Sequence, residues 1–227
     1  MKIASFISLF FLCFLFSNDY CNTSGLNSED IKINSSRAYY NIGDVISDED
    51  QQHEYSVCYS DGNYETGSTF RLADYTNEII LISMNATWWP ACYEYVSLMD
   101  ELHEFIDDTE NVNFVVSLDN AEVEPSLYSC QEWGDLYNEF GPYGNDPLIL
   151  NGDPDKLIWS MFAGSTYSAY VLIDHNMRVR YKFDMPNLYD FQYNYIPSLL
   201  DELYGCTDMG ACNYDSYAAV DDGSCEF

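Results

Sequence analysis

A strand buried on both faces, followed directly by an amphipathic helix, is the strongest structural signal in this sequence. Residues 79–84 form an almost unbroken apolar run, Ile-Ile-Leu-Ile-Ser-Met, which is typical of a strand covered on both faces. After a short turn the apolar period changes, and up to about residue 107 it matches one face of a helix. The residues of that face are Cys92, Val96, Met99, Leu102 and Ile106.

The rest of the chain continues this alternation of strands and helices. The predicted strands cover residues 55–59, 69–72, 112–118, 148–150, 169–173 and 178–183. The predicted helices cover residues 131–140, 154–162 and 187–204, the last interrupted near Pro197 because proline lacks a backbone N–H. This order predicts an α/β fold with a central sheet and helices on both faces.

The first residues predict export. Lys2 precedes an apolar run from Ile3 to Phe16, and polar residues follow it. The run is short for a membrane span, so residues 1–20 are expected to form a signal peptide, with an uncleaved anchor as the alternative. Residues 21–42 are rich in Asn, Ser and Asp and are expected to form a polar linker. We therefore expect a periplasmic or extracellular protein with no membrane contact after cleavage.

The charge of the chain excludes one class of partner. Its 227 residues include 8 Lys and Arg against 38 Asp and Glu, a formal charge of −30. Nucleic-acid binding needs clustered Lys and Arg, so no nucleic-acid partner is expected. The histidines, His53, His103 and His175, are dispersed and lack metal-ligand spacing, so they are given no metal role.

An exported chain can hold disulfides, and here the cysteine count is odd. Of eight cysteines, Cys13 leaves with the signal peptide, so seven remain and at least one is free, intermolecular or modified. The seven are Cys21, Cys58, Cys92, Cys130, Cys206, Cys212 and Cys225. A structural disulfide between Cys58 and Cys130 is one interpretation of the pair that flanks the core.

The turn at residues 85–92, Asn-Ala-Thr-Trp-Trp-Pro-Ala-Cys, carries the most informative motif. Here the sequence resembles the thioredoxin-like superfamily, particularly its exported TlpA-like and redoxin branches, which carry Ala-Thr-Trp-Cys-x-x-Cys at this place. The resemblance runs from about Gly43 to Tyr204 and includes Phe70-x-Leu72-x-Asp74 and the strand at 171–174. It implies a thioredoxin-like three-layer sandwich with a mixed sheet over residues 43–204, and a thiol–disulfide oxidoreductase that acts on protein disulfides without a cofactor.

This sequence departs from the family pattern at three positions. In the family, the first cysteine of the turn is the nucleophile at a helix N-terminus, and the second resolves the mixed disulfide. Here Trp89 stands at the nucleophile position, and Cys92 keeps the resolving position. Ser168 aligns with the family's cis-proline, and Ser83 aligns with its buried acid. Without the first cysteine an ordinary dithiol cycle is not expected.

Two classes of function stay open. The first is a monothiol redox enzyme that works through Cys92, with Cys130 as a distant resolving thiol, as in redoxins that use a remote partner. The second is a redox-inactive binding or scaffold module that holds a protein partner at the Trp88–Trp89 surface. In the second class Cys92 is a small buried hydrophobe and the tryptophans either pack over the sheet edge or anchor the partner.

A coding explanation for Trp89 also stays open. Some thioredoxin-like proteins carry selenocysteine-x-x-Cys in this turn, and some genetic codes read the selenocysteine codon UGA as tryptophan. A UGG codon at position 89 indicates an ordinary substitution. A UGA codon with a selenocysteine insertion element indicates a selenol that Cys92 resolves.

Residues 205–227 break the pattern and form a Cys- and Asp-rich tail. The tail resembles a short cysteine-flanked repeat that recurs in exported bacterial proteins. A tail this short cannot build an apolar core, and a disulfide staple from Cys206 to Cys225 is therefore expected. In the chain-entropy model, this bond stabilises the folded tail by about 3 kcal/mol. Calcium is one expected ligand, and a solvated acidic spacer or attachment loop is the alternative. The calcium ligands would be Asp208, Asn213, Asp215, Asp221 and Asp222.

Overall fold

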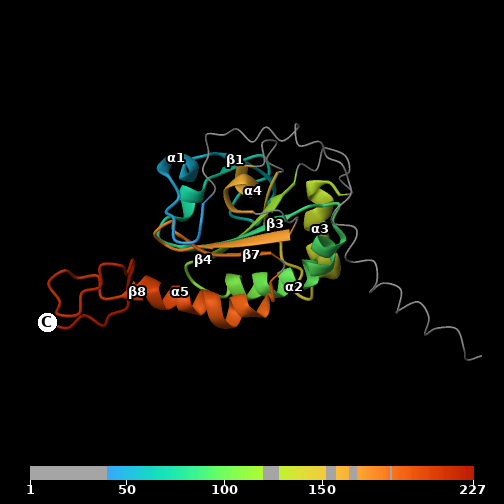
Figure 1. Ribbon diagram of the computed structural model, residues 1–227. Coiled ribbons are helices and arrows are strands. Elements are labelled where there is room, and N and C mark those ends of the chain that lie inside the picture. Colours follow the sequence, from blue (N-terminus) through green and yellow to red (C-terminus); the bar gives the residue numbers. More distant parts are fainter. Residues whose placement is uncertain (1–39, 120–127, 152–156, 164–167, 185) are drawn as a thin grey trace, which may run out of the picture. The chain divides into compact units, whose positions relative to one another are not determined.

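A seven-stranded mixed sheet forms the centre of the domain (Figure 1). The computed structural model describes residues 40–119, 128–151, 157–163, 168–184 and 186–227. The strands are β1 Tyr55–Tyr59, β2 Thr69–Phe70, β3 Ile79–Asn85, β4 Val112–Leu118, β5 Leu148–Leu150, β6 Ser168–Ile173 and β7 Val179–Asp184. Their order is β2-β1-β5-β4-β3-β6-β7, with β3, β4 and β5 parallel and the other neighbours antiparallel.

Helices cover both faces of this sheet. One face is covered by α2 Pro90–Asp107, α3 Cys130–Phe140 and α5 Ile196–Leu203. The other is covered by α1 Asp48–Gln51, α4 Leu157–Phe162 and a 3-10 helix at Leu72–Tyr75 (Figure 1). The predicted three-layer α/β sandwich is therefore confirmed. Among the described residues, no helix combines the length and the apolar character needed to cross a membrane.

The central strand β3 explains the apolar run in the sequence. All seven of its residues are buried. Ile79 and Leu81 belong to the core under α2, whereas Ile80 and Ile82 belong to the core under α4. Because successive side chains point to opposite faces, a strand covered on both sides needs an apolar residue at nearly every position.

Three local predictions need correction. The strand predicted over 69–72 ends at Phe70, because the Asp74 carboxylate accepts the Arg71 N–H at 2.9 Å and begins a 3-10 helix. Helix α1 was not predicted; the Ser47 hydroxyl caps it by accepting the Asp50 N–H at 3.3 Å. The helix predicted over 187–204 begins at residue 189, passes through a π-helix at Phe191–Tyr195 and continues as α5 past Pro197, so the predicted interruption is not seen.

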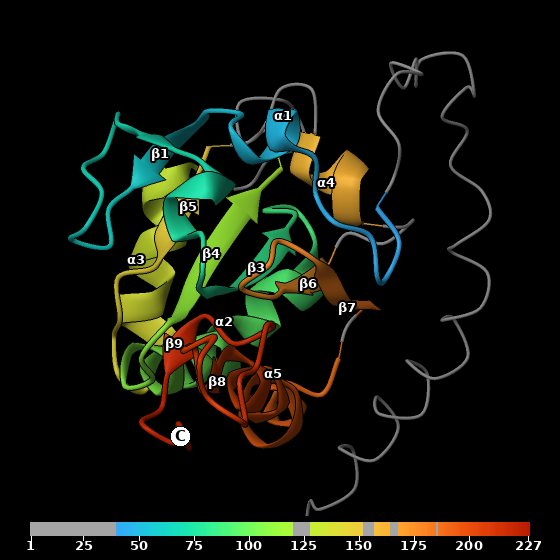
Figure 2. The same ribbon diagram turned by 90° about the vertical axis from the view of Figure 1, so that its left-hand side faces the viewer.

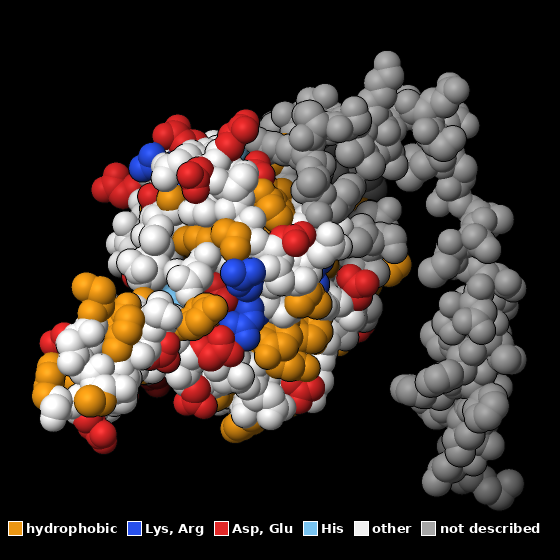
Figure 3. All heavy atoms as spheres, turned by 60° about the vertical axis from the view of Figure 1, so that its left-hand side comes forward, with side chains coloured by type: hydrophobic (Ala, Val, Ile, Leu, Met, Phe, Trp, Pro, Cys, Tyr) orange, Lys and Arg blue, Asp and Glu red, His pale blue; other side chains and the backbone are white. Residues whose placement is uncertain are grey.

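The tail has its own small framework. Strand β8 (Tyr204–Gly205) pairs in parallel with β9 (Val220–Asp221), beside the end of α5 (Figure 2). The predicted Cys206–Cys225 disulfide is confirmed. Figure 3 shows hydrophobic side chains on the tail surface, where Met209, Tyr217 and Phe227 are more than two-thirds exposed. The predicted signal peptide, linker residues 21–39 and the first residues of the helix predicted from 154 lie outside the described residues.

Candidate functional site

The turn between β3 and α2 is held by backbone bonds and by one carboxylate. The Trp89 N–H donates to the Ala86 carbonyl at 3.0 Å. The Thr87 N–H donates to Oδ1 of Asp119, which follows β4, at 2.9 Å. Pro90 is the first residue of α2, where its missing N–H costs no helical hydrogen bond. Together these contacts fix Trp89 as the N-cap residue of α2.

Two tryptophans form the outer surface of this turn. Trp89 is 37% exposed, and Trp88 is half-buried. Their ring centroids lie 5.6 Å apart in an edge-to-face arrangement, which aromatic pairs favour. Trp89 thus occupies the helix N-terminus that would stabilise a thiolate, but its indole cannot form an attacking anion.

Cys92 lies on the inner face of the helix. It is 1% exposed, packs in the core between α2, α3 and the sheet, and belongs to neither disulfide of the described residues. The same core holds Tyr137, whose pKa lies well above its ordinary value of 10.0 because the phenol is buried, with Tyr170, Asp100 and Cys92 adding to the effect. A core that keeps a phenol neutral also disfavours a charged sulfur.

The other two aligned positions also lie beside the turn. Ser83 is fully buried in β3, and its Oγ accepts a hydrogen bond from Nδ2 of Asn85 at 2.8 Å, so no acid occupies this place. Ser168 begins β6, and its backbone pairs with Asn85, the last residue of β3. The alignment of Ser168 with a cis-proline stays a prediction, because residue 167 lies outside the described residues.

Cys130, the predicted distant partner, is bonded elsewhere. It is the first residue of α3 and forms a disulfide with Cys58 of β1, with 6.1 Å between the Cα atoms. While this bond is intact, Cys130 has no thiol with which to resolve a bond at Cys92. The structure therefore brings Trp89, Cys92 and the backbone of Ser168 together, and it uses Cys130 to join β1 to α3.

An aromatic cluster beside the turn was not predicted from the sequence. The Tyr93 ring stacks on Tyr128 at 5.9 Å and meets Phe140 edge-to-face at 5.5 Å. Phe140, at the end of α3, is 46% exposed. The available signal was helical spacing, since Tyr93 follows Trp89 by four residues and so shares its side of α2. The contacts to α3 depend on tertiary packing and leave no local pattern.

The predicted calcium ligands are used within their own turns. Asp208 Oδ1 accepts the Gly210 N–H at 2.8 Å, and Asp222 Oδ1 accepts the Ser224 N–H at 2.8 Å. Asp215 and Asp221 accept from the residues two positions later, and Asn213 bonds the backbone of Ser224 and Glu226. Within the described part of the chain, no three His, Cys, Asp or Glu side chains gather as a metal site.

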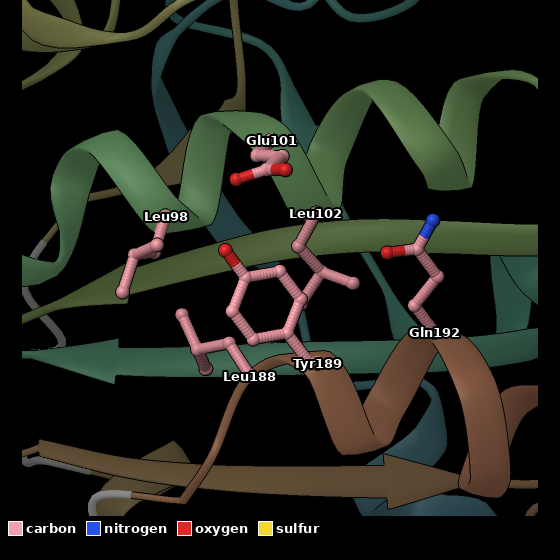
Figure 4. A pocket seen from close by; sticks show the side chains of 6 residues that line it. All are labelled: Leu98, Glu101, Leu102, Leu188, Tyr189 and Gln192. Carbon is pink, nitrogen blue, oxygen red and sulfur yellow. The ribbon is translucent and has the colours of Figure 1, made fainter.

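A shallow pocket lies on the same helix, away from the turn. Figure 4 shows its lining: Leu98, Glu101, Leu102, Leu188, Tyr189 and Gln192. Leucine side chains and the Tyr189 ring form its floor, and one carboxylate and one amide border it. This composition offers no nucleophile, so the pocket has no part in the thiol chemistry considered above.

Comparisons with known proteins identify the fold. No protein-family model and no curated protein matches the chain. A candidate protein disulfide isomerase from Bacteroides thetaiotaomicron matches with a TM-score of 0.53 at 11% identity, covering 72% of this chain and 92% of that one. MTB DsbF, in mixed oxidized and reduced forms, matches with a TM-score of 0.50 at 14% identity, covering 68% and 99%. The chain therefore has a thioredoxin-like fold, as the turn at residues 85–92 implied.

Proposed function

We propose that this protein is an exported, non-catalytic binding module that holds a protein partner at the Trp88–Trp89 surface. One observation carries the proposal. The N-terminus of α2, where the fold would hold a nucleophile, presents Trp89 with 37% of its surface exposed, while Cys92 behind it is 1% exposed. The accessible group at this position is a ring that binds by contact area.

The positions of the cysteines in the domain favour a binding module over a redox enzyme. The names of the two structural neighbours, DsbF and disulfide isomerase, refer to disulfide chemistry. That chemistry needs a thiolate that can reach a substrate disulfide and a second thiol that resolves the intermediate. Trp89 supplies no thiolate, Cys92 is buried and Cys130 is held by Cys58.

The surface around the turn has the composition of a protein-binding site. Trp and Tyr side chains are enriched among residues that dominate binding energy, because each offers a large rigid area and one polar group. Trp88 and Trp89 lie at the turn, and the cluster of Tyr93, Tyr128 and Phe140 extends the aromatic area towards α3.

Export is supported by sequence and by cysteine usage. The apolar run after Lys2 has the length of a signal peptide. The domain holds disulfides at Cys58–Cys130 and Cys206–Cys225, and such bonds persist in oxidising compartments.

Substitution of Trp89 tests the proposal. Immobilised wild-type protein and a Trp89→Ala variant are incubated with the exported protein fraction of the source, and the retained proteins are quantified by mass spectrometry. Tyr193→Ala is the matched control, because Tyr193 is an aromatic residue with 68% exposure on the π-helix. We expect a partner that wild type and the control retain equally and that Trp89→Ala retains about tenfold less.

Two results would overturn the proposal. One is equal retention of every protein by wild type and Trp89→Ala. The other is turnover of a protein disulfide by the wild type that Cys92→Ser abolishes, which would establish a monothiol redox enzyme in place of a binding module.

A further inference from the structure

Three cysteines lie in the tail, away from the thioredoxin-like turn. Cys206 and Cys225 form the staple, and Cys212 lies inside the loop that the staple closes. Cys212 is exposed and is bonded to neither disulfide of the described residues. Cys212 is thus an accessible thiol within the loop of an existing disulfide.

Backbone and side-chain hydrogen bonds place Cys212 beside Cys225. The Cys212 N–H donates to the Glu226 carbonyl at 2.7 Å. Nδ2 of Asn213 donates to the Ser224 carbonyl at 2.8 Å, and Oδ1 of Asn213 accepts the Glu226 N–H at 2.8 Å. Both chain neighbours of Cys225 are therefore bonded to residues 212 and 213.

The three tail cysteines differ in exposure, and this difference indicates which sulfur could attack and which could be attacked in a thiol–disulfide exchange. Cys212 is exposed, Cys225 is half-buried and Cys206 is 1% exposed. Thiol–disulfide exchange requires access of the attacking sulfur to the sulfur that it attacks, whereas the leaving sulfur can stay covered. Cys225 is thus the more accessible of the two bonded cysteines.

We propose that the tail carries a thiol–disulfide exchange site of its own, with Cys212 as the nucleophile and the Cys206–Cys225 staple as its substrate. The Cys212 thiolate attacks Sγ of Cys225. The Cys212–Cys225 bond forms, the Cys225–Cys206 bond breaks, and the sulfur of Cys206 leaves with the electron pair. Cys206 then takes up the proton that Cys212 released, so the number of disulfides is unchanged and no oxidant is consumed.

Chain entropy favours neither form strongly. The present staple spans 19 residues in sequence, and the exchanged bond from Cys212 to Cys225 encloses a shorter loop. The closure entropy depends weakly on loop length, so on this ground alone the populations of the two disulfide forms differ by only about a factor of two. The population of the two forms is therefore set by folded contacts, of which the burial of Cys206 is the main one.

The two forms differ in what the disulfide holds. In the present form Cys225 is tied to the root of the tail, next to β8, where the Cys206 carbonyl also accepts the Asp215 N–H at 2.9 Å. In the exchanged form the disulfide joins Cys212 to Cys225, and Cys225 is no longer bonded to the residue that follows β8. Exchange therefore releases the end of the tail from the residues next to β8.

Disulfide mapping of the full chain tests the proposal. The protein is incubated without reductant, its thiols are alkylated rapidly, and it is digested with a protease that cuts before Asp. Asp208 separates Cys206 from Cys212, and Asp215 separates Cys212 from Cys225, so each linkage yields its own peptide pair. We expect two species, Cys206–Cys225 with alkylated Cys212 and Cys212–Cys225 with alkylated Cys206.

Three variants make the result decisive. Cys212→Ser should give the Cys206–Cys225 linkage alone, whereas Cys92→Ser, which changes a buried cysteine outside the tail, should give both. Cys206→Ser should oxidise to the Cys212–Cys225 disulfide. A single linkage in the wild type, exchange that occurs only in denaturant, or a Cys206→Ser protein that keeps both tail thiols reduced under oxidising conditions would overturn the proposal.

Discussion

Asp100 is a charged residue with no exposed surface, and its surroundings explain how it is tolerated. Its carboxylate accepts three backbone N–H groups, from Tyr143 at 2.7 Å, Gly144 at 3.1 Å and Asn145 at 2.8 Å. These bonds hold the loop between α3 and β5 against α2. A carboxylate offers acceptors only, so it suits a site lined by donors.

Asp100→Asn should destabilise the domain by about 2–3 kcal/mol, because the new NH₂ group faces N–H donors and leaves them unsatisfied. The free energy of unfolding from denaturant titration measures this. The matched control is Asp108→Asn, an exposed position at the end of the same helix, with an expected change within about 0.5 kcal/mol. Equal effects at both positions would contradict a buried, bonded carboxylate.

Trp89→Cys restores the sulfur pair of the family at the turn. We expect a disulfide with Cys92, because the N-cap and third helical positions face each other across one turn of α2. Reductase activity should stay weak, since the predicted alignment places Ser168 where the family has proline. Thiol counting and an insulin-type turnover assay measure the two effects. Turnover equal to that of an ordinary dithiol thioredoxin would show that position 89 alone had silenced the site.

The gene offers a separate check on Trp89. We expect the codon UGG, because Ser83 and Ser168 also depart from the family pattern in the predicted alignment. Sequencing of the coding DNA decides this. A UGA codon followed by a selenocysteine insertion element would mean a selenol at the exposed N-cap of α2 and would restore the redox hypothesis.

At the scale of elements, hydrophobic periodicity located most of the strands and helices. Residues 79–84 predicted β3 because a strand between two layers is apolar throughout. The 3-10 helix at Leu72–Tyr75 was missed because one side-chain bond, from Asp74 to the Arg71 N–H, decides it. The turn could be recognised from its sequence, whereas the burial of Cys92 and the bond between Cys58 and Cys130 depend on distances that only the fold sets.

The tail should be ordered by its staple more than by burial. A variant with both Cys206→Ser and Cys225→Ser loses about 3 kcal/mol of constraint, so residues 205–227 should exchange amide hydrogens faster and be cut faster by proteases. Helix α2 should keep its protection, because the Cys58–Cys130 bond and the core remain. Faster exchange in α2 would show that the tail supports the domain.

Calcium should leave that digestion unchanged. Among the described residues, no three His, Cys, Asp or Glu side chains gather closely enough to hold a metal, and calcium needs several oxygen ligands. Limited proteolysis of the wild type with added calcium and with chelator measures this. Protection of residues 205–227 by calcium alone would restore the calcium hypothesis.

At the scale of the whole molecule, tyrosines set the response to alkali. Burial, followed by hydrogen bonding to Asp146, raises the pKa of Tyr59 to about 12. Burial, followed by the charge of Asp74, raises the pKa of Tyr64 to about 12. The unfolded chain loses these protons near the ordinary value of 10.0, whereas the folded chain keeps them longer. The folded state then binds more protons, so stability falls as pH rises across this window and is unaffected below it.

The free energy of unfolding should therefore decrease from about pH 10 to about pH 12, and unfolding should add the absorbance of the buried tyrosines to that of the exposed ones. Tyr59→Phe should reduce the slope of the unfolding free energy against pH, because phenylalanine has no phenolic proton to lose. Identical slopes for Tyr59→Phe and the wild type would contradict the assignment to Tyr59.

The Cys58–Cys130 disulfide has a mechanical consequence for the domain. The bond bridges 72 residues of sequence, and that segment contains β3, the tryptophan turn, α2 and β4. A pulling force applied at the two ends of the chain would pass through the sulfur–sulfur bond and bypass this segment. The tryptophan turn would therefore carry no tension until the covalent bond itself was reduced, even while β6, β7 and α5 were drawn out.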